Sequence, residues 1–248
     1  LAITRNTNSA FGSYLVLAKT RSGSVGGSTI LQDDDEIGTV RFSGADGNDR
    51  ASHAAEISAQ VDGTPGSNDM PGRLVFKTTA DGANSATEKM RIQSDGKIGI
   101  GTGANIDELL HVQASSGNVY AKVETEASNS SAGLRLLGGN NDESRIHFGD
   151  SDDVDIGKIV YIHGSTNAMA FTTNTSEAMR ITSAGNVGIG ETAPDAELHI
   201  KQGDAGSVTT HANVALVLEG SGDTFLQFQT PATATDVGIL FSDTGGIA

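Results

Sequence analysis

The amino-acid sequence predicts an all-β protein, an elongated rod built from repeats of short strands in which three parallel chains intertwine. Three observations predict it. One segment of fourteen residues occurs in two similar copies along the chain, and internal repeats indicate a repeat architecture. Apolar residues alternate with polar ones, which is the period of a strand. Aromatic residues make up 4% of the chain and glycine contributes 32 of 248 residues, so side chains for a thick core are scarce.

The repeat is clearest in two ungapped segments, EKMRIQSDGKIGIG at Glu88–Gly101 and EAMRITSAGNVGIG at Glu177–Gly190, which are identical at nine of fourteen positions. A Leu-His-Val or Leu-His-Ile strand follows each copy, at Leu110 and Leu198. The chain therefore divides into a first unit, 1–112, with an extra loop or hairpin at 45–72, a second unit, 113–200, and a partial third unit, 201–248.

Each unit is expected to begin with a Leu-x-Leu strand. An Ile-Gly strand, a strand ending in Thr-Thr or Thr-Asn, and the fourteen-residue segment then follow. The Leu-x-Leu strands are predicted at 15–17, 134–136 and 216–218, and the Ile-Gly strands at 36–42, 155–161 and 236–241. Only the first unit has a further alternating run, Ala55–Val61, and a long Gly/Pro loop follows it. Stacked repeats tolerate insertions confined to one loop.

The fourteen-residue segment is predicted to turn at Asp95-Gly96, because glycine adopts positive φ without steric cost. Its apolar residues share one face, and Gly99 and Gly101 lie on the other, where a missing Cβ lets a second backbone approach. We therefore expect subunit packing and register to involve Met90, Arg91, Ile92, Gly96, Gly99, Gly101, Met179, Arg180, Ile181, Gly185, Gly188 and Gly190. Arg91 and Arg180 are expected to pair with Glu88 and Glu177, or with a carboxylate of a neighbouring chain.

The charge of the chain limits its partners. Lysine and arginine total 16 against 31 acids, for a net charge of −15, and such a surface repels nucleic acid and anionic headgroups. No apolar stretch is long enough for membrane insertion. Cysteine is absent, so stabilisation outside cells is expected to come from oligomerisation. The start at Leu1 suggests a fragment or a processed product.

The sequence offers two candidate metal sites, and a simpler interpretation is favoured for each. The acidic runs at 33–36 and 150–155 could bind Ca²⁺, but neither has the ligand spacing of a known calcium loop, so solvated loops are the simpler interpretation. His111 and His199 occupy equivalent positions and could form a ring of imidazoles around a three-fold axis. A partly exposed strand residue is the favoured alternative. The sequence predicts no metal and no cofactor.

Catalysis is not expected either. Asp46, Asp49 and Glu56 could form a pair of carboxylates that hydrolyses a glycosidic bond, but carboxylates are abundant in this chain. The sequence has no nucleophile elbow, zinc-protease helix, phosphate loop or dinucleotide fingerprint.

The pattern E-x-M-R-I-x-S-x-G-x-V-G-I-G, followed by a short loop and L-H-V, resembles repeats of tail-fibre proteins of tailed bacteriophages. The stretch from Ala55 to Ile92 of the first unit resembles the same family. The first linker, Gly103–Asp107, lacks the expected proline that the second keeps at Pro194, which leaves its loop geometry open. The resemblance implies a homotrimeric, β-rich shaft, often followed by a self-cleaving, endosialidase-type chaperone domain.

The resemblance further implies an extracellular location on the virion exterior and a structural role in host attachment. The expected partners are two further copies of the chain, other fibre, baseplate or neck proteins, and a glycan or protein of the host surface. We expect receptor contact in the loop Ala45–Gly72, since loops on a rigid scaffold carry recognition, through Asp46, Asn48, Asp49, Asn68 and Asp69. A glycan-depolymerising tailspike, a bacterial surface adhesin and a monomeric β-solenoid are the alternatives.

Overall fold

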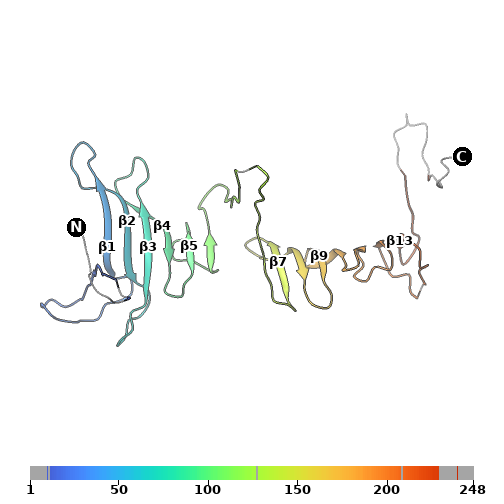
Figure 1. The fold of residues 1–248 in the computed structure, drawn as a ribbon, viewed down its shortest axis with the longest axis horizontal. Helices are drawn as coiled ribbons and strands as arrows, with labels where there is room; N and C mark the ends of the chain where they lie inside the picture. Colours follow the sequence, from blue (N-terminus) through green and yellow to red (C-terminus); the bar gives the residue numbers. More distant parts are fainter. Residues whose placement is uncertain (1–9, 11, 127, 208, 229–238, 240–248) are drawn as a thin grey trace. The chain divides into compact units, whose positions relative to one another are not determined.

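The computed structural model describes residues 10, 12–126, 128–207, 209–228 and 239. The chain forms two compact units, 1–122 and 123–248, each built around one β-sheet (Figure 1). All regular structure among the described residues is strand, which confirms the all-β prediction. No described helix is long and apolar enough to cross a membrane.

The first sheet has six strands in the order in which they occur in the chain. They are β1 (Glu36–Gly44), β2 (Ser52–Val61), β3 (Gly72–Thr78), β4 (Thr87–Ile92), β5 (Ile98–Ile100) and β6 (Leu110–Val112). Neighbouring strands are antiparallel except β5 and β6, which are parallel. The run Ala55–Val61, predicted as an extra strand of the first unit, lies in β2, which pairs with both β1 and β3.

The second sheet repeats this plan with seven strands, again in chain order. They are β7 (Glu143–Phe148), β8 (Gly157–Ile162), β9 (Ala168–Thr173), β10 (Ser176–Ile181), β11 (Val187–Ile189), β12 (Leu198–Lys201) and β13 (Leu216–Glu219). β11, β12 and β13 are parallel to one another. β13, which was predicted as part of the third unit, therefore continues the sheet of the second. β7 and β8 take the places that β1 and β2 have in the first sheet, so the prediction of an extra strand in the first unit alone was wrong.

Two of the predicted Leu-x-Leu strands do not form. Residues 15–17 and 134–136 have no strand structure, and Leu15 and Leu134 are 62% and 76% exposed. A strand needs a neighbour that satisfies its backbone groups, and these segments pair with none of the described strands, whereas Leu216–Glu219 pairs with β12. The predicted strand at 236–241 falls almost wholly outside the described residues.

Strand register places the large apolar side chains of each sheet on one face, in two rows that cross the strands. In the first sheet, one row follows the pairs Val40–Ile57–Phe76–Met90–Ile100–Val112. The other row follows Gly38–Ala59–Leu74–Ile92–Ile98–Leu110. The second sheet has the equivalent rows Ile146–Ile159–Phe171–Met179–Ile189–Ile200–Leu218 and Ser144–Tyr161–Met169–Ile181–Val187–Leu198–Leu216. We call these surfaces the apolar faces.

The small core of each unit lies on the opposite, polar face. Ser58 and Val75 are fully buried there in the first sheet, and Ala168 and Ala170 are buried in the second. On the same faces Arg73 and Arg91 of the first sheet are 9% exposed, and Val160 of the second is 6% exposed. Part of the polar face of each sheet is therefore buried within the chain, whereas much of the apolar face is uncovered.

Candidate functional site

The apolar faces are candidate binding surfaces of the two sheets. In the first sheet Val40, Phe42, Ile57, Leu74, Ile100, Leu110 and Val112 are between 38% and 61% exposed. In the second sheet Ile146, Phe148, Tyr161, Ile189 and Leu216 are between 36% and 54% exposed. Single apolar residues scattered over a surface are ordinary, but a contiguous apolar surface of this kind is typical of a protein–protein contact.

The repeated Glu-x-Met-Arg motif builds a β-bulge with an ion pair across it. Lys89 is an extra residue in β4, because Glu88 pairs with Lys77 while Met90 pairs with the preceding residue of β3. The bulge puts residues 88 and 91 on the same face, although residues three apart in a regular strand face opposite ways. Arg91 Nε and Nη2 therefore each donate to Glu88 at 2.7 Å.

The second copy repeats this geometry at Ala178, with Arg180 donating to Glu177 at 2.6 and 2.7 Å. These hydrogen bonds are the main reason that the pKa of Arg180 is raised. The predicted pairing of both arginines with the glutamate three residues earlier is confirmed, and both pairs lie within one chain.

Replacing Arg91 with alanine should cost about 1–2 kcal/mol of unfolding free energy, because its side chain is only 10% exposed and both hydrogen bonds to Glu88 are charge-assisted. Urea denaturation measures the change. Arg145→Ala is the matched control, since that arginine also binds a nearby carboxylate, Glu143, but is 47% exposed. The control should change stability by less than about 0.5 kcal/mol. Equal losses in the two variants would contradict a structural role for the bulge.

The repeated glycines are required by contacts within the chain. Gly101 has φ +78, and its N–H donates to the carbonyl of the bulged residue Lys89 at 3.0 Å. A Cβ on Gly101 would lie 2.1 Å from the backbone oxygen of Gln113. Gly190 has φ +71 and bonds Ala178 O in the same way. These contacts account for the glycines without a second subunit, so their expected role in subunit packing stays a prediction.

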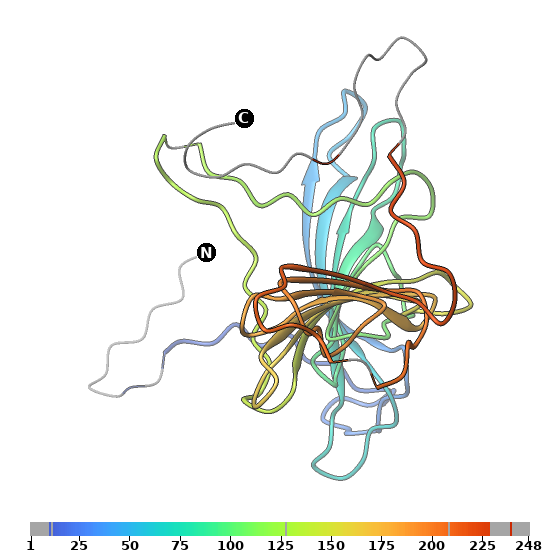
Figure 2. The same ribbon diagram turned by 90° about the vertical axis from the view of Figure 1, so that its right-hand side faces the viewer.

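The predicted receptor loop does not form one surface. Asp46, Asn48 and Asp49 lie in the β1–β2 hairpin, whereas Asn68 and Asp69 lie in the β2–β3 loop at the other end of β2. β2 has 10 residues and so spans about 30 Å. The β1–β2 hairpin instead lies beside the β3–β4 hairpin, as both views show (Figure 1, Figure 2).

The carboxylates considered as ligands or catalysts are used in turns and ion pairs. Asp46 accepts hydrogen bonds from the Asp49 and Asn48 N–H groups and from Ser52, and these lower its pKa to about 2. Asp35 binds Arg21, and Asp150 accepts from two backbone N–H groups of its own loop. These carboxylates therefore accept hydrogen bonds from their own loops or pair with nearby arginines, as expected of solvated turns.

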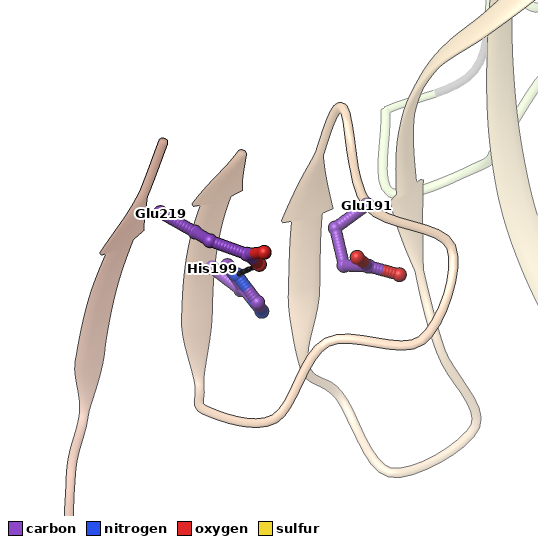
Figure 3. A group of neighbouring side chains, drawn as sticks. All are labelled: Glu191, His199 and Glu219. Carbon is purple, nitrogen blue, oxygen red and sulfur yellow. Dashed lines mark hydrogen bonds and ion pairs between the residues drawn. The ribbon is translucent and has the colours of Figure 1, made fainter. Parts of the chain in front are cut away.

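The two repeated histidines occupy equivalent places on the polar face. Each pairs across the sheet with a glycine, His111 with Gly99 and His199 with Gly188. Each Nδ1 also faces the N–H of the aspartate four residues earlier, at 3.5 Å for His111 and 3.4 Å for His199. Within the second unit, sequence reasoning missed that His199 lies beside Glu191 and Glu219 (Figure 3).

Comparison with solved structures gives a clear likeness. The chain superposes on the carboxy-terminal domain of the bacteriophage T5 L-shaped tail fibre with a TM-score of 0.57, covering 95% of this chain and 100% of that one. The two share a fold. A structure of that T5 domain with its intra-molecular chaperone domain matches with a TM-score of 0.52, over 97% of this chain and 71% of that one. Sequence identity is 10% and 12%, so the likeness is one of fold.

Sequence comparisons add no family assignment, since no protein-family model and no curated protein sequence matches the chain.

Proposed function

We propose that the chain is a structural part of a bacteriophage tail fibre, a repeat-built shaft in which three parallel copies pack through their apolar faces. The observation that carries the proposal is the pair of apolar rows on each sheet, in which side chains such as Val40 and Ile100 are 43% and 40% exposed. The shared fold with the T5 tail-fibre domain supports it.

Burial of these rows would stabilise the assembly. Removing apolar surface from water is worth roughly 25 cal/mol per Å², and each exposed Val, Leu, Ile or Phe adds to that gain. A three-fold arrangement lets each apolar face contact both neighbouring copies and closes the assembly, so that no apolar face is left open to further growth. The repeat of the rows in both sheets lets the same packing recur along the chain.

The proposed role is mechanical and adhesive and needs no enzymatic step. A shaft on the virion exterior would connect to other fibre, baseplate or neck proteins and hold a contact surface toward a glycan or protein of the host. In the first unit we assign this surface to the neighbouring β1–β2 and β3–β4 hairpins, with Asp46, Asn48 and Asp49 in the first. Many weak contacts from three chains would supply avidity.

The native mass of the full chain tests the proposal. Light scattering after size exclusion should give about three times the 25.4 kDa of one chain, and electron micrographs should show slender particles. A folded monomer would contradict the proposed packing, because the chain would then be stable with its apolar faces exposed to water. A dimer would contradict three-fold symmetry.

A further inference from the structure

The second unit holds a group of metal-binding side chains that the proposed function does not use. Glu191 follows β11, His199 lies on β12 and Glu219 lies on β13, and one ligand atom of each lies within 4.8 Å of the others (Figure 3). Among the described residues, this is the one group of three or more such side chains that meets this distance. We propose that Glu191, His199 and Glu219 bind a divalent transition-metal ion of the Zn²⁺ type, which displaces the ammonium group of Lys201.

The donor set fits such an ion. One imidazole nitrogen and two carboxylates are ligands that Zn²⁺ takes in proteins, and hard cations such as Mg²⁺ prefer oxygen ligands alone. The His199 residue is 2% exposed, and the side chains of Glu191 and Glu219 are 15% and 14% exposed, so water reaches the site only in part. The group borders a cavity of about 300 Å³, which gives room for an ion and a bound water.

Backbone N–H groups orient the two glutamates. Ala193 N–H donates to Glu191 Oε1 at 2.7 Å, and Ala205 N–H donates to Glu219 Oε1 at 2.8 Å. Second contacts of this kind orient ligands before the ion binds. The other oxygen of each carboxylate, Oε2, faces a side chain of the site: Glu219 Oε2 lies 2.9 Å from His199 Nε2, and Glu191 Oε2 accepts from Lys201 Nζ.

Lys201 now supplies the positive charge of this group. Its Nζ lies 2.9 Å from Glu191 Oε2 and 3.5 Å from Glu219 Oε1. The lysine side chain is 25% exposed and flexible, so it can turn toward solvent when an ion takes its place. Acidic side chains remain in excess around the cavity, where Asp195 and Asp204 join the two glutamates against one lysine.

Binding requires two rearrangements. His199 Nε2 now lies 2.9 Å from Glu219 Oε2, and Nδ1 faces the Asp195 N–H at 3.4 Å, a geometry in which Nδ1 accepts and Nε2 donates. An ion on Nε2 requires the proton to move to Nδ1, where it replaces the long contact with Asp195. The ligand atoms must also settle at roughly 3.4 Å from one another, which follows from tetrahedral Zn–ligand distances near 2.1 Å, so His199 Nε2 and Glu219 Oε2 must move apart from 2.9 Å.

The first repeat provides a natural comparison. Its equivalent histidine is His111, but Thr102 and Gln113 stand where the second repeat has Glu191 and Lys201. The carboxylate and the lysine are therefore exchanged together for neutral residues. The proposal predicts that only the second repeat binds the ion, and that Lys201→Gln, which introduces the first repeat's residue, binds it more tightly.

The experiment titrates the full chain with Zn²⁺ by calorimetry and with Co²⁺ by visible absorption. We expect one ion per chain, and an affinity up to about fivefold higher for Lys201→Gln, the factor that corresponds to removing one competing, partly exposed ion pair of about 1 kcal/mol. Glu219→Gln should weaken binding, whereas His111→Gln should leave it unchanged.

Two results would overturn the proposal. The first is a Lys201→Gln variant that binds no stoichiometric ion, which would show that the group is only an internal ion pair. The second is binding by Glu219→Gln and His199→Gln, once shown by circular dichroism to be folded, that is as tight as in the unaltered chain. The ion would then be held by the acidic surface in general.

Discussion

Replacing Val40 and Phe42 with aspartate should convert the proposed trimer into monomers. Both residues lie on β1 and point from the apolar face, where they are 43% and 54% exposed in the single chain. Burying a Val or Phe side chain contributes about 1.5–3 kcal/mol, and burying an unpaired carboxylate in its place costs several kcal/mol more. Three-fold symmetry repeats each loss in every copy.

Light scattering measures the change, and circular dichroism shows whether the sheet persists. The control is Arg41→Ser, which lies between the two residues but points from the polar face, where its contact with Glu56 is 3.5 Å long. The control should remain trimeric. Dissociation of both variants alike, or of neither, would show that the apolar face of the first sheet is not the subunit contact.

The faces and most of the strands could be predicted from the sequence because both depend on local pattern. Alternation with period two assigns Met90, Ile92, Ile98 and Ile100 to one face, and the registers keep them together. The turn at Asp95-Gly96 also forms as predicted, with Gly96 at φ +87. The face of each strand and the position of this turn depend on the propensity and alternation of a few adjacent residues.

The features that could not be predicted from the sequence depend on contacts between residues far apart in the chain or on irregular backbone. The bulge at Lys89 could not be seen in the alternation, although it explains why glutamate and arginine recur three residues apart. The group around His199 needs β12 and β13 to be parallel neighbours. The residues of the predicted loop 45–72 separate because the run between them is one long strand, β2.

Gly101→Ala should lower stability far more than the same change at Gly103. Both glycines have positive φ, +78 and +61, so each alanine carries roughly 1–2 kcal/mol of backbone strain. At Gly101 the new Cβ would also lie 2.1 Å from the Gln113 carbonyl oxygen, whereas at Gly103 nothing lies within 4 Å. Relieving that clash should strain the Gly101–Lys89 hydrogen bond, which ties β5 to the bulge.

We expect Gly101→Ala to cost about 3–4 kcal/mol in total and to lower the melting temperature by roughly 6–12 °C, with a much smaller shift for Gly103→Ala. Gly190→Ala should behave like Gly101→Ala, because its Cβ would lie 2.3 Å from the Lys201 carbonyl oxygen.

These variants distinguish two reasons for the repeated glycines, contact within the chain and packing between subunits. If the clash within the chain dominates, Gly101→Ala should lose stability even in dilute monomer, since the obstructing atom belongs to the same chain. If Gly101→Ala leaves the unfolding of each chain unchanged and only weakens association, the glycines serve subunit packing instead.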